Sequence, residues 1–381
     1  MLFAKSSDRP AVEPQLVVPG EQRGPGGRLA TQYLDLPDLG SISLVMAQPT
    51  WLWGAEHGVN AAGVAIGNEK IFTRHAADAT RPGLIGMDLV RLGLERATTA
   101  DEALEAMVGL LEQWGQSGIA DAIHAEAYVS SFLIVDPSGG WVLETYGSTW
   151  AARRVGQGSA ISNRVSLRDD WERGSADLEI GTDLDTLRDP NRPTQSADGR
   201  LAATSAAVRG GDLEPLGAMA VLRDHGQGPW GIRDHRPHLP PASTADDGTG
   251  VSVCMHAYRD LATTSSMVAL LSDDGLQRLW AAPGAPCVAP FLPLAIVDGV
   301  PVIPSILSDL ETWRALARLR RMIEVSGGLL EEVRGLVGAL EAELLAASLG
   351  LGLDQTAWSV LCGEASIRTA EVIAAVIPRE K

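Results

Sequence analysis

The clearest pattern of hydrophobic and polar positions lies in residues 86–113, where apolar side chains recur at intervals of three and four residues. This spacing is the period of a helix with one buried face. Thr99 and Glu102 form a capping-box sequence, in which the hydroxyl and the carboxylate can each accept a hydrogen bond from the other residue's backbone N–H. The pattern predicts two helices that meet at Thr98 and Thr99.

Short apolar runs separated by turn residues predict β-structure in other parts of the chain. Residues 129–136 and 141–146 flank the sequence Pro-Ser-Gly-Gly, which is typical of a hairpin turn between two strands. Further strands are expected at residues 41–47, 63–67, 150–155, 159–163, 262–271 and 277–281.

Two segments and the C-terminal region have other signatures. Residues 181–199 and 227–250 are rich in Pro, Gly and Asp and are expected to be loops or insertions. Between Pro304 and Pro378 there is no proline, and Leu, Ala, Glu and Arg abound, which predicts helices with a break near Gly327 and Gly328.

The order of these elements indicates the fold class. Strands in adjacent hairpins, with helices grouped between them, are typical of an α+β or layered α/β protein rather than a regular βαβ series. We expect one main domain over residues 1–304 and a helical C-terminal region over residues 305–381.

Composition narrows the classes of protein and partner. The chain has 381 residues, of which 45% are hydrophobic and 21% charged, as in soluble globular proteins. Its net charge of -17 opposes nucleic acid or an anionic membrane as a partner, because both must be met by clustered Lys and Arg. The longest uncharged run, residues 279–297, contains four prolines and is therefore a poor candidate for a membrane-spanning helix. We expect a cytoplasmic protein, and its few lysines and many arginines suggest a bacterial source.

The three cysteines are Cys254, Cys287 and Cys362. So small and odd a number predicts neither a disulfide framework nor paired zinc ligands, and a reducing compartment is the simplest interpretation. Cys254 and His256 could form a catalytic pair, but two residues at this spacing on a strand share a face without thereby forming a dyad.

Common cofactor and catalytic motifs do not occur. The sequence has no phosphate-binding loop, no His-Glu-x-x-His helix and no Gly-x-Ser-x-Gly elbow. These motifs alone therefore do not identify a function. A set of possible metal ligands lies in a Pro- and Arg-rich stretch that favours a solvated loop instead. This set consists of His225, His235 and His238, with Asp224 and Asp234 nearby.

Several segments carry a family resemblance. They are residues 3–10 (Phe-Ala-Lys-Ser-Ser-Asp-Arg-Pro), residues 51–69, which begin with Trp-Leu-Trp-Gly-Ala-Glu and end with Gly-Asn-Glu, and residues 86–96, 161–164, 253–256 and 263–268. The chain resembles the secernin group of cysteine-type dipeptidases, which are related to the choloylglycine hydrolases within the N-terminal-nucleophile hydrolases. The resemblance runs from Phe3 to about Pro304, is most specific in residues 51–69, and implies a four-layer αββα sandwich.

The resemblance also implies roles for individual residues. In this family the first residue of the mature protein is a catalytic cysteine, whose own α-amine can act as general base. Asp8 would orient that amine, Lys5 would favour the thiolate, and Asn60 and Asn163 would polarise the substrate or donate to the oxyanion. The alternatives are turn capping for the two asparagines and an exposed ion pair for Lys5 and Asp8.

Trp51, Trp53 and Glu56 belong to the most specific segment of the resemblance and are assigned to substrate binding. For the two tryptophans, packing in the core is the alternative to a place in the pocket wall.

The chain departs from the family pattern at the nucleophile. Relatives carry the cysteine in a short strand upstream of a Lys-Asn-Ser-Asp-Arg turn, whereas Met1 stands only four residues before Lys5. Ser6 replaces the usual asparagine, and Ser265 or Ser266 stands where some relatives have an arginine. Either the start codon is misassigned and the cysteine is encoded upstream, or the product is a noncatalytic member.

The resemblance implies an amidohydrolase of the dipeptidase type, which cleaves small peptide or amide substrates through a cysteine thioester and needs neither a metal nor an organic cofactor. The alternatives are a noncatalytic binding or scaffolding protein and an acylase that acts on a non-peptide amide. The chain as printed, without the N-terminal cysteine, is expected to be inactive.

Overall fold

The computed structural model describes residues 1–381 except residues 21, 75–76, 193, 212, 227–250, 258–259, 327–328 and 378–381. The chain forms two compact units. The first contains residue 1, residues 20–212 and residues 271–273, and the second contains residues 2–19, 213–270 and 274–381. Each unit therefore combines segments that are far apart in the sequence.

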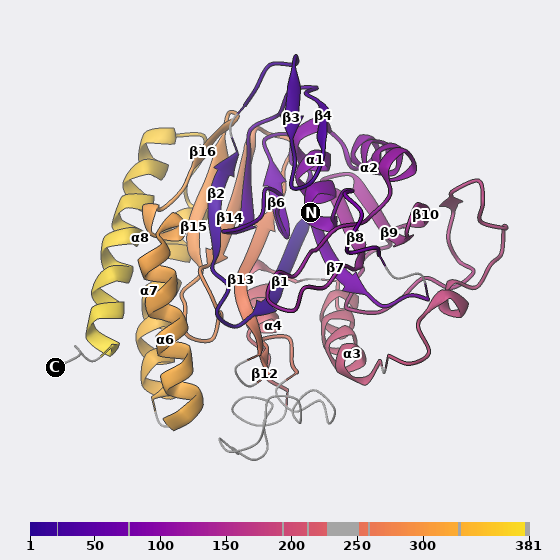
Figure 1. Ribbon diagram of the computed structural model, residues 1–381. Coiled ribbons are helices and arrows are strands. Elements are labelled where there is room, and N and C mark those ends of the chain that lie inside the picture. The colour runs from indigo at the N-terminus through magenta and orange to yellow at the C-terminus, as the bar shows by residue number, and fades with distance from the viewer. Residues whose placement is uncertain are drawn as a thin grey trace. The chain divides into compact units, whose positions relative to one another are not determined.

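The first unit is built on an antiparallel sheet (Figure 1). Its strands follow the order β11 (Arg173–Gly174), β10 (Thr149–Arg154), β9 (Gly139–Tyr146), β8 (Val129–Asp136), β7 (Ala65–Ile71), β6 (His57–Asn60) and β5 (Leu44–Pro49). Helices α1 (Gly86–Arg96) and α2 (Ala100–Trp114) pack on the central strands, α1 on β6 and β7 and α2 on β8 and β9. A 3-10 turn, η1 (Leu184–Leu187), and helix α3 (Gln195–Arg209) follow the sheet.

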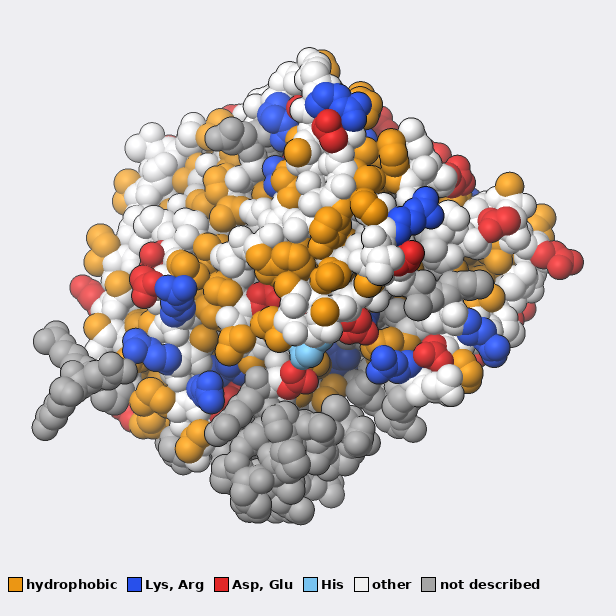
Figure 2. Space-filling model, in the orientation of Figure 1, with side chains coloured by type: hydrophobic (Ala, Val, Ile, Leu, Met, Phe, Trp, Pro, Cys, Tyr) orange, Lys and Arg blue, Asp and Glu red, His pale blue; other side chains and the backbone are white. Residues whose placement is uncertain are grey.

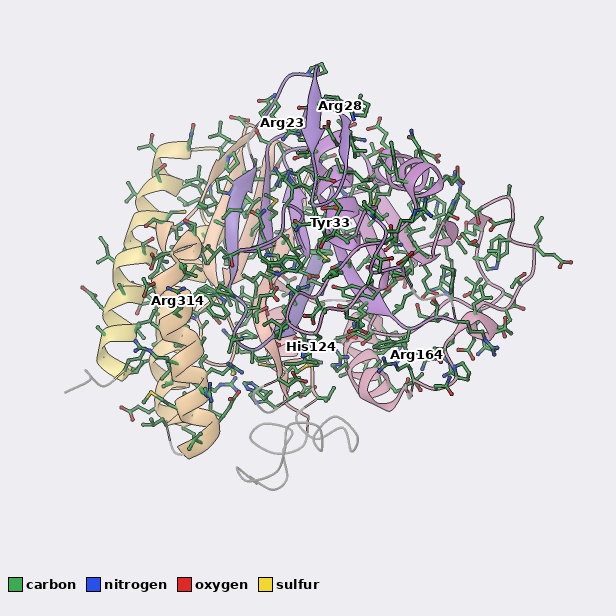
Figure 3. All side chains as sticks on the ribbon, in the orientation of Figure 1. Arg23, Arg28, Tyr33, His124, Arg164 and Arg314 are labelled. Atoms are coloured by element: carbon green, nitrogen blue, oxygen red, sulfur yellow. The ribbon has the colours of Figure 1, made fainter. Side chains whose placement is uncertain are left out.

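A two-stranded hairpin, β3 (Arg28–Ala30) and β4 (Asp35–Pro37), also belongs to this unit. Two arginines labelled in Figure 3 anchor it. Arg28 pairs with Asp35 across the hairpin, with 3.1 Å between Nε and Oδ2. Arg23 lies 2.7 Å from Glu95 in α1 and 3.2 Å from Asp38, so it joins the end of the hairpin to the helix.

Helices α1 and α2 confirm the periodicity of residues 86–113. Met87, Val90 and Leu94 are fully buried on the face that the spacing predicts. The Thr99 hydroxyl accepts from the Glu102 N–H at 3.1 Å, as in a capping box. The Glu102 carboxylate accepts from the Thr98 N–H at 2.8 Å and from the Thr98 hydroxyl at 2.6 Å, so the box also engages the residue before its ideal partner.

The β8–β9 hairpin is confirmed, but the strand expected at residues 159–163 is wrong. Those residues form bends and irregular backbone. The outer edge of β10 is occupied by β11, with Ala151 opposite Gly174 and Ala152 opposite Arg173. A short apolar run can become a strand only where a partner edge is open to it, and another segment takes this edge.

The second unit is built on a second antiparallel sheet. Its order is β1 (Leu2–Pro10), β13 (Leu261–Leu270), β14 (Leu276–Ala282), β15 (Leu292–Val297) and β16 (Val300–Val302), and the short strand β12 (His256–Ala257) also pairs with β13. Residues 3–10, one of the segments that carry the family resemblance, are therefore part of a strand. Strand β2 (Gln15–Gly20) follows β1 in the chain.

Helices cover this sheet as well. Helix α4 (Pro215–Leu222) packs on β1 and β13, and α7 (Leu330–Leu349) and α8 (Gln355–Val376) pack on β15. A 3-10 turn, η2 (Ser305–Ser308), leads into α6 (Leu310–Ser326). The helical C-terminal region is thus confirmed, and a second break at Gly350 separates α7 from α8. The predicted break at Gly327 and Gly328 lies outside the described residues.

The α+β class is confirmed, since each unit is an antiparallel sheet with helices packed on it. The four-layer order stays a prediction. The helices after residue 304 pack inside the second unit with β15 and β16. None of the described helices combines the length and apolar character needed to cross a membrane. On the face drawn in Figure 2, acidic and basic side chains are interspersed.

Candidate functional site

Strand β1 carries Lys5 and Asp8, both half-buried, in the second unit. The Asp8 carboxylate accepts a hydrogen bond of 2.7 Å from the Thr263 hydroxyl on β13. The register shifts at this point, since Ser7 lies opposite Ser265 and Asp8 opposite Thr263. The Lys5 ammonium donates to the carbonyl of Ser6. The Thr263 hydroxyl therefore helps to fix the position of the Asp8 side chain, and Thr263 begins one of the segments, residues 263–268, that carry the family resemblance.

Two departures from the family pattern lie opposite each other. Ser6 pairs with Ser266 across β1 and β13, and their hydroxyl oxygens are 3.2 Å apart. The resemblance led us to expect a longer asparagine at the first position and an arginine near the second. Two small hydroxyl side chains therefore face each other across β1 and β13. Both of them replace longer polar side chains that the resemblance led us to expect.

The segment Trp51-Leu52-Trp53-Gly54-Ala55-Glu56 connects β5 to β6 and docks on the start of α1. Gly54 allows this close approach, because a Cβ atom there would lie 2.3 Å from the carbonyl carbon of Met87. Arg91 stacks over the Trp53 ring at 4.2 Å and also donates to the Trp53 carbonyl at 2.6 Å. This close contact between a loop and a helix restricts which residues the segment can contain.

The three residues assigned to substrate binding are largely enclosed. Trp51 packs against a buried cluster that includes Leu52 and Met87. Glu56 is buried, and the side-chain amide of Asn68 lies 2.6 Å from its Oε2 and donates to it when the amide nitrogen faces that oxygen. For Trp51 and Trp53 the geometry matches the core-packing alternative.

Asn60 is fully buried at the end of β6, and all its polar atoms are engaged by backbone. Its Nδ2 donates to the carbonyls of Leu94 and Ala97 at 2.8 and 2.7 Å. Its Oδ1 accepts from the N–H groups of Ala62 and Val64, both at 3.0 Å. With both amide hydrogens bound to the C-terminal end of α1, the side chain has no donor left for an oxyanion, and it fits the turn-capping alternative.

Asn163 is half-buried and differently placed. Its Nδ2 donates to the Lys70 carbonyl at 3.0 Å, and its Oδ1 accepts from Arg200 at 2.7 Å. Lys70 forms an ion pair with Glu126 and lies 5.1 Å from the centre of the Tyr128 ring. Asn163 thus belongs to a polar cluster at the end of β7. Sequence reasoning missed the other members, although Lys70 is one of only three lysines in the chain.

Two buried carboxyl groups of the first unit were also missed. Burial raises the pKa of Asp88 to about 7, although its Oδ2 accepts from the Ile85 N–H at 3.3 Å. Burial also raises the pKa of Glu144, whose Oε1 accepts from the Ser166 N–H at 2.6 Å and from the Ser166 hydroxyl at 2.7 Å. Asp88 lies in the segment 86–96 that carries the resemblance, whereas nothing in its strand sequence distinguishes Glu144.

All three cysteines are buried in the second unit, with 0% exposure for Cys254, 1% for Cys287 and 3% for Cys362. Cys362 donates to the carbonyl of Pro293, and burial raises its pKa to about 12. Cys254 does meet His256, with 3.4 Å between Sγ and Nε2. A buried thiol cannot reach a dissolved substrate, so this contact does not make a catalytic dyad.

The stretch that contains the possible histidine ligands, for which a solvated loop is expected, is only partly described. His235, His238 and Asp234 lie outside the described residues. His225 does not join a solvated loop, since it is buried and lies edge-on to His256 at 4.9 Å between ring centres. The Asp224 carbonyl accepts from the Cys254 N–H at 3.0 Å.

Part of this chain matches a known protein family. Residues 37–196 match the sequence pattern described as Peptidase family C69. Over this segment the chain resembles peptidase family C69. It contains Trp51, Glu56, Asn60 and Asn163, whereas Lys5 and Asp8 lie outside it. The match confirms the resemblance drawn from residues 51–69.

Two solved structures are also similar to the chain. One is a mutant of the conjugated bile acid hydrolase from Clostridium perfringens, with 11% identity, a TM-score of 0.41, and coverage of 73% of this chain and 84% of that chain. The other is penicillin V acylase from Agrobacterium tumefaciens, with 13% identity, a TM-score of 0.36, and coverage of 78% of this chain and 84% of that chain.

Proposed function

We propose that this protein hydrolyses amide bonds in small peptides, as a cysteine-type dipeptidase. The observation that carries the proposal is the family C69 match over residues 37–196, a segment that the sequence analysis reached independently through Trp51-Leu52-Trp53-Gly54-Ala55-Glu56.

The nucleophile of the proposed reaction is a cysteine encoded upstream of Met1. Burial of Cys254, Cys287 and Cys362 argues against each of them. Among the described strands, β1 pairs with β13 alone, so one of its edges is available for a preceding antiparallel strand. A cysteine on such a strand would lie beside Lys5 and Asp8, the residues that the resemblance assigns to it.

The reaction follows from the chemistry of that terminus. The α-amine takes the thiol proton, the thiolate attacks the peptide carbonyl, and the tetrahedral intermediate collapses to a thioester as the protonated amine product leaves. Water then hydrolyses the thioester and restores the thiol. Asp8, held by the Thr263 hydroxyl, would orient the amine, and Lys5 would favour the thiolate.

The test compares three proteins. The first is the chain as printed, the second carries the in-frame residues encoded upstream so that it begins with cysteine, and the third is the second with that cysteine replaced by serine. Each is assayed against a dipeptide panel and against non-peptide N-acyl amides, and the intact mass is measured for a covalent acyl-enzyme. We expect dipeptide hydrolysis and the acyl adduct only in the second protein.

Robust hydrolysis by the printed chain would refute the proposed nucleophile. Selective cleavage of the N-acyl amides would make the protein an acylase instead. Within the active protein, Thr263→Val should lower kcat by about tenfold and leave KM nearly unchanged, since the Thr263 hydroxyl donates to Asp8 and accepts from the Met255 N–H at 2.9 Å but would not contact substrate. Cys362→Ser is the matched control and should retain full activity.

The second candidate is a noncatalytic binding protein of the same family, and burial of all three cysteines is the observation that favours it. An in-frame stop codon directly before Met1, with no cysteine codon between them, would decide for this candidate.

A further inference from the structure

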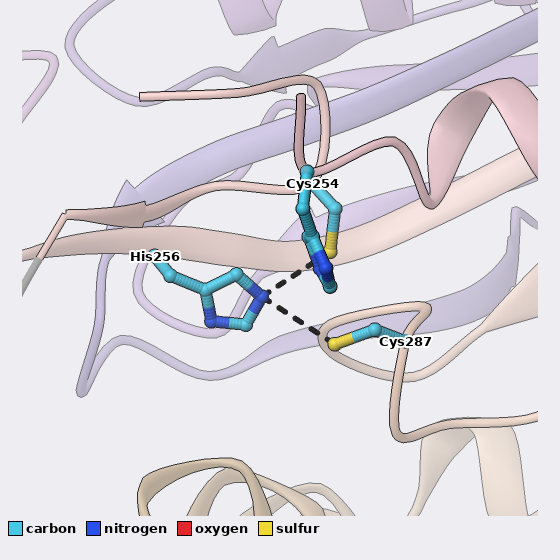
Figure 4. A group of neighbouring side chains, drawn as sticks. Cys254, His256 and Cys287 are labelled. Atoms are coloured by element: carbon cyan, nitrogen blue, oxygen red, sulfur yellow. Dashed lines mark hydrogen bonds between the residues drawn. The ribbon is translucent and has the colours of Figure 1, made fainter. Parts of the chain in front are cut away.

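Four side chains that sequence reasoning treated separately converge in the second unit. They are His225 after α4, Cys254 and His256 at the start of β12, and Cys287 in the connection from β14 to β15. One ligand atom from each lies within 4.8 Å of all the others, and all four residues are buried. Figure 4 shows His256 pointing between Cys254 and Cys287.

We propose that these four residues bind one zinc ion. Two thiolates and two imidazoles are a common ligand set of structural zinc sites, which are tetrahedral and closed to water. Two thiolates also balance the charge of Zn²⁺, so that a dry interior would hold a neutral group.

The distances fit this ion. With ordinary Zn–S and Zn–N bond lengths, a tetrahedral site separates sulfur from nitrogen by about 3.6 Å. His256 Nε2 lies 3.4 Å from the Sγ atoms of both Cys254 and Cys287. A cation could therefore be held with only small movements of these side chains.

The surroundings of His256 resemble those of a metal ligand. Its other ring nitrogen, Nδ1, lies 2.7 Å from the Glu324 carboxylate, which leaves Nε2 directed at the two sulfurs. Such a carboxylate fixes the ring orientation and tautomer of a ligating histidine. Glu324 is itself held by Arg320 at 3.0 Å, and Arg320 donates to the Ala11 carbonyl at 3.2 Å.

The rival interpretation is a reactive Cys-His pair. It fails on access, because Cys254, Cys287 and His256 are each at most 1% exposed. A closed four-ligand site has no open position for substrate, so the proposed zinc is structural. It would tie α4, β12 and the β14–β15 connection together, and Glu324 would link it to α6.

The test uses the full chain, stripped of metal and titrated with Zn²⁺ and with Co²⁺. We expect one ion per chain and, with Co²⁺, the visible bands of a tetrahedral site together with a thiolate-to-cobalt charge-transfer band. Cys254→Ser and Cys287→Ser should each weaken that charge-transfer band. Glu324→Gln should keep the spectrum and lower the affinity for Co²⁺ by about tenfold or more.

Cys362→Ser is the matched control, since Cys362 is an equally buried cysteine that bonds to backbone carbonyls. If Cys254→Ser or Cys287→Ser fails to fold, the Co²⁺ spectrum of the unsubstituted protein decides alone. Absence of the charge-transfer band in that protein would overturn the zinc site, as would its loss in Cys362→Ser.

Discussion

Asn60 and the cluster of Cys254, Cys287, His225 and His256 are both buried and polar, but they are organised in opposite ways. Asn60 gives every polar atom of its side chain to nearby backbone groups. In the cluster, two sulfur atoms meet one imidazole nitrogen, and four potential ligand atoms face one another.

This difference separates a residue that builds the fold from residues that can bind something. A buried polar group satisfied by backbone has no capacity left for a ligand, whatever a family resemblance assigns to it. Side chains that converge on a common point retain that capacity. Each prediction below tests this distinction, starting with the largest expected effect.

Removing the metal should produce the largest change. If zinc occupies the cluster, a chelator that strips it should lower the free energy of unfolding by about 4 kcal/mol, the stabilisation expected when the free ion exceeds its Kd about a thousandfold. Thermal unfolding with and without chelator measures the effect. A melting temperature indifferent to chelator in a protein shown to contain zinc would contradict it.

Asn60→Ala should cause the next largest loss of stability. It removes four hydrogen bonds to buried backbone, and at roughly 1 kcal/mol each the loss should be about 3 to 4 kcal/mol. Urea unfolding measures it, with the exposed Asn191→Ala as control. A variant of unchanged stability that had lost only catalytic activity would instead restore the oxyanion role.

Asp88 is an intermediate case, because its Oδ2 is bonded while its Oδ1 is buried without a hydrogen-bond partner among the described residues. Burial raises its folded-state pKa to about 7, so the folded protein binds more protons than the unfolded chain above the usual aspartate pKa. Its contribution to stability is therefore complete at low pH and is lost as the pH rises through about 7.

The matching experiment compares the unfolding free energies of the unsubstituted protein and Asp88→Asn. Between about pH 5 and pH 7 the variant should gain of the order of 2 kcal/mol relative to the unsubstituted protein. The exposed Asp35→Asn serves as control. A difference that does not change with pH would show that Asp88 is already ionised in the folded protein.

The smallest change in stability is expected at an exposed polar pair that neither supports the buried fold nor forms part of a binding site. Arg28 and Asp35 form an ion pair with 60% and 59% of their side chains exposed. Arg28→Gln should change the free energy of unfolding by less than about 1 kcal/mol, and less still at high salt. A larger loss would mean that the β3–β4 hairpin depends on this pair.

Local patterns in the sequence predicted local structure well. The period of residues 86–113 identified α1 and α2, and two apolar runs about a turn identified the β8–β9 hairpin. The strand expected at residues 159–163 failed because strand formation depends on an open edge, which is a property of the fold.

The candidate sites show the same limit. Trp51 to Glu56 could be recognised because a loop that docks on a helix imposes a continuous sequence pattern. The Cys and His cluster could not, because its ligands are spread over residues 225–287 without a standard zinc spacing and meet only in the folded unit. An odd number of cysteines even argued against such a site, although two of the three meet and Cys362 lies elsewhere.

The pairing of β1 with β13 has a consequence for synthesis on the ribosome. Ser6 lies opposite a residue 260 positions later in the chain. At ordinary translation rates of about 5 to 20 residues per second, β1 emerges roughly 13 to 52 seconds before its partner strand. During that time its backbone hydrogen-bonding groups remain open to solvent, to chaperones or to other nascent chains, so the second unit is the one whose yield should depend most on how quickly the chain is completed.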